Sequence, residues 1–78
     1  MRINIIKQVM DDDFLIRTAE EFATREALQP YLVMSERTMF ALEDVKTGNI
    51  VSNNNGYEFM DYKILINNNL SFGDVDIR

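Results

Sequence analysis

The feature that most constrains how this chain can fold is an amphipathic stretch that ends just before its only proline. Apolar side chains recur there at positions i, i+4, i+7 and i+8, the spacing of one helical face, and they are Leu15, Ala19, Phe22 and Ala23. The aspartates at 11–13 can cap a helix and complement the positive end of its dipole. Pro30 cannot continue a helix. We therefore expect a helix from Asp13 to Leu28.

After Pro30 the sequence changes to short apolar segments separated by turn-forming residues. Apolar and polar alternation predicts strands at 31–34, 38–45, 50–52, 57–66 and 70–77, and a further strand at 2–9. Turns are expected at 35–37, 46–49, 53–56 and 67–69, and the Asn55-Gly56 pair is the strongest turn signal. The alternation changes phase at Gly73-Asp74, which indicates a β-bulge in the last strand.

These segments predict one α+β domain over residues 1–78. A β-α unit followed by a meander would give one helix packed on an antiparallel sheet of four to six strands, in two layers. The alternative is that Asp13–Glu21 pairs with the first strand as a hairpin. A chain of 78 residues buries a thin core, and the absence of cysteine leaves no disulfide to reinforce it.

The composition argues against catalysis. Without His or Cys, the chain lacks the commonest general base and the commonest ligands of transition metals. Its serines lie in no nucleophile motif, and its three glycines are too far apart for a phosphate-binding loop. We interpret Asp11–Asp13 as a helix cap, and Asp74 with Asp76 as charges that protect an edge strand. The sequence therefore predicts a protein that is not an enzyme, with no catalytic, cofactor-binding or metal-binding residues.

Charge and hydropathy narrow the class of partner. No apolar run approaches the roughly 20 residues that span a bilayer, so we expect no membrane association and a cytoplasmic location. The chain carries 13 acidic and 8 basic residues, for a net charge of −5. Direct binding to nucleic acid requires clustered Lys and Arg, so this charge disfavours it. A protein partner with a basic surface is compatible with the charge.

Residues 57–66 suggest an interaction surface. As one continuous strand, this segment would carry apolar side chains on both faces, and a single helix covers only one face of a sheet. The uncovered face would then need a partner, a second copy of the chain or a curled sheet. The candidate partner-binding residues are acids and aromatics in the second half of the chain: Glu43, Asp44, Tyr57, Glu58, Phe59, Asp61, Asp74 and Asp76.

In composition, the chain resembles the small acidic accessory proteins of bacteriophages and mobile elements. It is short, has eight Asn and eight Ile, and lacks Cys, His and Trp. Many such proteins are inhibitors, including anti-defence proteins and antitoxins. This resemblance implies a non-catalytic inhibitor that blocks a basic surface of a nucleic-acid-acting enzyme. The alternative is a structural or assembly protein that self-associates, for example as a homodimer, through the second face or the edge of its sheet.

Overall fold

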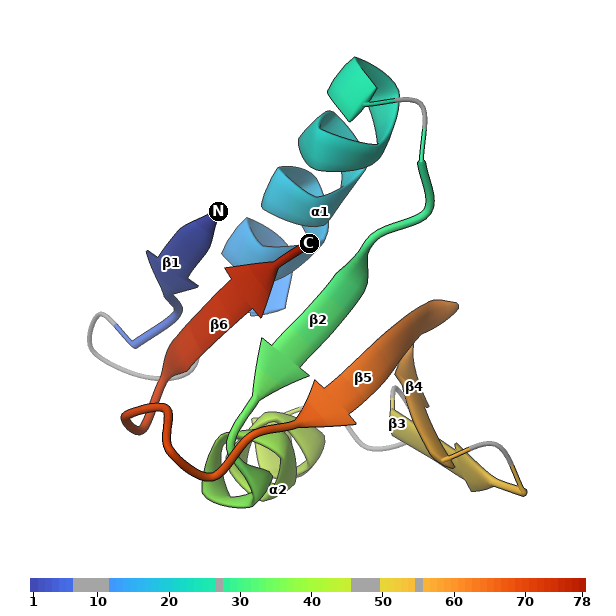
Figure 1. The fold of residues 1–78 in the computed structure, drawn as a ribbon. Helices are drawn as coiled ribbons and strands as arrows, with labels where there is room; N and C mark the ends of the chain where they lie inside the picture. The colour runs from blue at the N-terminus through green and yellow to red at the C-terminus, as the bar shows by residue number, and fades with distance from the viewer. Residues whose placement is uncertain (7–11, 27, 46–49, 55) are drawn as a thin grey trace.

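The sheet and its helices are described by a computed structural model for residues 1–6, 12–26, 28–45, 50–54 and 56–78. Within these residues, two helices pack on one six-stranded sheet (Figure 1). The elements are β1 (Arg2–Asn4), α1 (Asp12–Glu26), β2 (Tyr31–Met34), α2 (Glu36–Val45), β3 (Ile50–Asn53), β4 (Gly56–Phe59), β5 (Tyr62–Ile66) and β6 (Asp74–Ile77). The α+β class, the two layers and the strand count are confirmed.

The strand order is β1-β6-β2-β5-β4-β3. β6 runs antiparallel to both of its neighbours, β1 and β2, so β1-α1-β2 is a β-α-β unit split by the C-terminal strand. β2 and β5 are parallel, and the remaining pairs are antiparallel. The sheet is therefore mixed, and the prediction of a wholly antiparallel meander with one helix is wrong.

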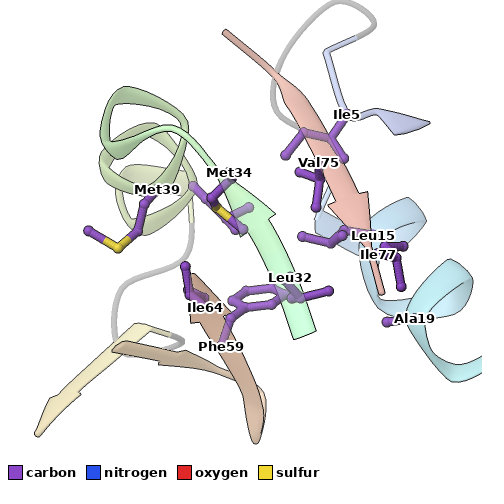
Figure 2. Close-up of a cluster of buried hydrophobic side chains, with 11 residues drawn as sticks. Ile5, Leu15, Ala19, Leu32, Met34, Met39, Phe59, Ile64, Val75 and Ile77 are labelled. Carbon is purple, nitrogen blue, oxygen red and sulfur yellow. The ribbon is translucent and has the colours of Figure 1, made fainter. Parts of the chain in front are cut away.

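The predicted helix is confirmed as α1, with ends within two residues of those expected, and the hairpin alternative is wrong. Leu15 and Ala19 are fully buried, while Phe22 packs at the margin of the core. Figure 2 shows α1 side chains meeting those of β2 and β6. The buried apolar cluster consists of Ile5, Leu15, Ala19, Leu32, Met34, Met39, Leu42, Phe59, Ile64, Val75 and Ile77.

Residues 36–45 form the second helix, so the strand predicted at 38–45 and the turn predicted at 35–37 are both wrong. Met39 and Leu42 are buried, whereas Phe40, Glu43 and Asp44 are exposed, which is a helical period. Over so short a segment an apolar pattern fits either period. Ser35 favours the helix locally, because its hydroxyl accepts a hydrogen bond from the Thr38 amide at 3.2 Å and so caps α2.

The segment predicted as one strand at 57–66 is a two-strand hairpin. Phe59 pairs with Tyr62, which leaves Met60 and Asp61 as a two-residue turn with φ of 51° and 72°. Such a turn requires positive φ at both positions and is usually built from Asn and Gly, so Met60-Asp61 did not predict a turn. The prediction of a continuous strand is wrong.

This turn changes which side chains share a face. Paired residues project on the same side of a sheet, so Phe59 and Tyr62 lie on one face although their positions differ in parity. Tyr57 and Ile64 form the next pair on that face, which is the face covered by the helices. The inference of two apolar faces is therefore wrong for most of these side chains, because it assumed an unbroken strand. Of the apolar residues in β4 and β5, Leu65 lies on the open face.

The remaining turn predictions have mixed outcomes. Asn53 pairs with Gly56, which confirms a turn between β3 and β4. The last strand covers only Asp74–Ile77, and residues 67–73 form turns that end at Gly73 with φ of 88°. The expected bulge at Gly73 is therefore a turn that precedes the strand. The turn expected at 46–49 and the end of the first strand, 7–9, lie outside the described residues.

Candidate protein-binding surface

The candidate partner-binding residues lie on three separate parts of the fold. Glu43 and Asp44 are on α2, Asp74 and Asp76 are on β6, and the others belong to the β4–β5 hairpin. In the sheet, β6 is separated from β4 by β2 and β5. The structure therefore does not gather these acids into one acidic surface, and each group has to be considered by itself.

The β6 carboxylates are engaged within the protein. β6 lies between β1 and β2, so the edge-protection role given to Asp74 and Asp76 is wrong. Asp76 is 15% exposed and lies 2.9 Å from Arg78 Nε, 3.6 Å from the amino group of Met1 and 3.9 Å from Arg2. The hydrogen bond from Arg78, together with these charges, lowers the pKa of Asp76. Asp74 accepts a hydrogen bond of 2.7 Å from Asn4.

The β4–β5 hairpin divides its candidate residues between core and surface. Phe59 is fully buried, so it stabilises the fold and cannot form the apolar centre of a contact. Tyr57 is half-buried on the helix-covered face. Glu58 and Asp61 line a hollow of about 250 Å³ together with Gln29, Pro30, Tyr31 and Lys63. Lys63 pairs with Glu58 across the hairpin, which offsets part of the acidic charge.

The outer face of α2 joins acidic charge to an exposed aromatic ring. Successive residues of a helix are about 100° apart, so Glu36, Arg37, Phe40, Glu43 and Asp44 occupy an arc of about 120° with Phe40 at its centre. All are exposed, and the Phe40 side chain is 49% exposed. An isolated exposed Phe is unremarkable, but here acids flank it on the same helical face.

A loop from the far end of the chain holds this face in place. The Gly73 amide donates a hydrogen bond of 2.9 Å to the buried Thr38 hydroxyl, which is also bonded to the Ser35 hydroxyl at 2.8 Å. The Glu36 amide donates to the Asn68 side chain at 2.8 Å. These contacts fix residues 67–73 against the beginning of α2. Figure 1 shows the segment between β5 and β6 passing beside this helix.

The same loop adds a second aromatic ring. Phe72 is 41% exposed, and the Arg37 guanidinium lies over its ring at 5.2 Å from the centroid. We call Glu36, Arg37, Phe40, Glu43, Asp44 and Phe72 the α2 surface. The candidate residues included only Glu43 and Asp44 of this set. The helical pattern of residues 36–44 would have placed Phe40 among these acids if the segment had been recognised as a helix. Phe72 joins the surface only because the folded loop contacts α2, so the sequence contains no local signal for it.

The described residues offer no arrangement suited to metal binding, because they contain no group of three or more His, Cys, Asp or Glu side chains that could hold an ion. In the same part of the chain, no helix is long and apolar enough to cross a membrane. Comparison with known proteins found no matching family model, no matching curated protein and no matching solved structure. The physical properties of the α2 surface therefore carry the functional argument.

Proposed function

We propose that this protein is a non-catalytic binding module whose α2 surface docks on a basic surface of a partner protein. The observation that carries the proposal is the position of Phe40, exposed at the centre of a helical arc in which Glu36, Glu43 and Asp44 are acidic. Aromatic anchors ringed by polar residues are the usual energetic centres of protein interfaces.

The two parts of the α2 surface have different roles in this proposal. Phe40 and Phe72 supply apolar area. Burial of this area at the interface slows dissociation and so lengthens the lifetime of the complex. The acids form a rim whose field attracts positive charge and speeds association, and salt screens it with a Debye length of about 8 Å at physiological ionic strength. Arg37 is held over Phe72, so its charge offsets the acids on one side of the arc only.

The proposed target is a cytoplasmic enzyme that acts on nucleic acid. Such enzymes bind phosphates through clustered Lys and Arg, which is the chemistry that complements an acidic helix face. Occupation of that cluster by the α2 surface would exclude the nucleic acid, so the protein would act as an inhibitor of the antitoxin or anti-defence type. The net charge of −5 supports this direction of attraction.

The experiment is affinity capture from host lysate with the wild type and two matched variants. Glu43→Lys reverses a charge on the α2 surface, and Glu21→Lys makes the same change at an exposed glutamate of α1. We expect a captured enzyme whose nucleic-acid activity falls when the wild-type protein is added. Glu43→Lys and Phe40→Ala should lose both capture and inhibition, while Glu21→Lys should retain them.

Kinetics on the purified pair separates the two roles. Raising the salt concentration, or introducing Glu43→Lys, should mainly lower the association rate, whereas Phe40→Ala should mainly raise the dissociation rate. Equal loss with Glu21→Lys and Glu43→Lys would mean that net charge, rather than the α2 surface, governs binding. The proposal is contradicted if Phe40→Ala binds the enzyme with the wild-type affinity, or if binding leaves the enzyme's activity unchanged.

A further inference from the structure

β3 forms one edge of the sheet. It pairs with β4 on one side, and among the described residues no strand pairs with its other side. An edge strand therefore presents a row of backbone N–H and C=O groups that can template the addition of another strand. Figure 1 shows β3 at the end of the sheet opposite β1.

The two edges differ in the features that normally prevent such pairing. β1 has only three residues and carries Arg2, whose side chain is 54% exposed. β3 reads Ile50-Val51-Ser52-Asn53, with no charge and no proline. It runs alongside the whole of β4, and its Val51 side chain is 51% exposed. Short length, charge and proline are the usual protections of an edge, and β3 lacks the last two.

We propose that β3 pairs antiparallel with β3 of a second copy of this chain, joining two six-stranded sheets across a two-fold axis. Each copy carries a net charge of −5, so two copies repel over most of their surfaces and approach best where acids are absent. The neighbouring strand β4 carries one acid, Glu58, which pairs with Val51 of β3. Across the joined sheet the two Glu58 residues would be three strand spacings apart, about 14 Å, which exceeds the Debye length of about 8 Å.

The alternation of side chains sets the register of this pair. Ile50 lies on the helix-covered face with its partner Phe59, whereas Val51 lies on the open face with Glu58. A two-fold axis perpendicular to the sheet keeps the helices of both copies on one side and pairs residues that share a face. Placing Val51 opposite Val51 meets this condition, and it sets Ile50 opposite Ser52. The two exposed Val51 side chains then cover each other.

The contact is short, so the association should be weak and reversible. In this register three residues of each β3 strand pair, Ile50 to Ser52, and such a contact buries less than the roughly 1,200 Å² of a standard interface. We expect sedimentation equilibrium between about 1 μM and about 1 mM to show a monomer–dimer equilibrium. The symmetric pair uses the free edge of both copies, so it closes at the dimer and leaves no β3 edge for further growth.

Substitutions at Val51 test the register. Val51→Lys places two ammonium groups opposite each other and should raise the dissociation constant about tenfold or more. Val51→Thr keeps a neutral β-branched residue and should retain the dimer. Leu65→Lys makes the same change on the open face of β5, where the side chain is 43% exposed, and should also retain it. Mixing Val51→Lys with Val51→Glu should restore a heterodimer, because opposite charges then meet at the axis.

Cooperative thermal melts of each variant show that the fold is intact. A wild-type protein that stays monomeric over the whole concentration range overturns the proposal. If Leu65→Lys dissociates the dimer, the contact lies on the open face rather than at the β3 edge. Oligomers larger than a dimer would mean that the copies associate head to tail and not as a symmetric pair. Failure of the charge-swapped pair to associate would refute the Val51-centred register. None of these results bears on the α2 surface, whose variants are separate.

Discussion

Thr38→Val should weaken the fold by removing one buried hydroxyl. The Thr38 side chain is fully buried, and its hydroxyl accepts a hydrogen bond from the Gly73 amide at 2.9 Å while bonding the Ser35 hydroxyl at 2.8 Å. Valine has nearly the same shape, so the change opens no large cavity. It removes the contact that ties the β5–β6 loop to the beginning of α2.

The expected loss follows from the groups left behind. A buried amide without an acceptor costs about 1–3 kcal/mol, and the lost bond to Ser35 adds about 1 kcal/mol. The new buried methyl group of valine offsets about 0.8 kcal/mol of this loss. The free energy of unfolding should therefore fall by about 2 kcal/mol, which lowers Tm by about 8–16 °C for a domain of this size.

Urea unfolding followed by circular dichroism measures this loss, with Thr38→Ser as the control. Serine keeps the hydroxyl and deletes the methyl, so it should cost less than valine even though valine is the more apolar residue. The Gly73 amide should exchange with solvent faster in Thr38→Val than in Thr38→Ser. The reasoning is refuted if valine proves the milder substitution, or if the exchange rate of Gly73 is the same in both.

Three further predictions follow from other parts of the structure. Phe59→Ala should cost about 3–5 kcal/mol in urea unfolding because its ring is fully buried, and a loss below about 1 kcal/mol would remove Phe59 from the core. Replacing Met60-Asp61 by Asn-Gly should stabilise the hairpin by about 1 kcal/mol, because those residues favour the positive φ observed there; a lower Tm would contradict the turn geometry. The lowered pKa of Asp76 means that its contribution to stability is present above the unfolded pKa near 3.8 and is lost as the pH falls through the folded value. Acid titration should therefore show a shallower loss of stability in Asp76→Asn than in the wild type, and parallel curves would show that the cations around Asp76 contribute nothing.

The sequence predicted the features that depend on neighbouring residues. The period of Leu15, Ala19 and Phe22 and the stop at Pro30 are local, so α1 formed within two residues of its expected ends. The turn at 53–56 was also found, because Asn and Gly favour such turns by their own backbone preferences. The same is true of the chemistry that the composition excludes, since a chain without Cys and His cannot regain thiol or imidazole chemistry by folding.

The candidate surfaces were less predictable from the sequence. Glu43 and Asp44 were identified as acids, but their helical arrangement around Phe40 was missed because the segment was interpreted as a strand. Asp76 was expected at an exposed edge, and it lies between two strands beside three cationic groups. Phe59 was expected at a partner contact and belongs to the core. Each error concerns the face that a side chain occupies. The alternation of apolar and polar residues does not predict that face when a turn interrupts the strand.

The sequence by itself therefore determined α1, the turns at 53–56 and 67–69, the acidic charge and the absence of thiol and imidazole groups. Only the tertiary structure decided that 38–45 is a helix, that Met60 and Asp61 turn the chain, and that β6 lies inside the sheet. The physical reason is the range of the interactions. A helical period is set within a few residues, whereas the hydrogen bond from Gly73 to Thr38 spans 35 positions and the one from Asn4 to Asp74 spans 70. Such contacts form only when the whole chain is folded.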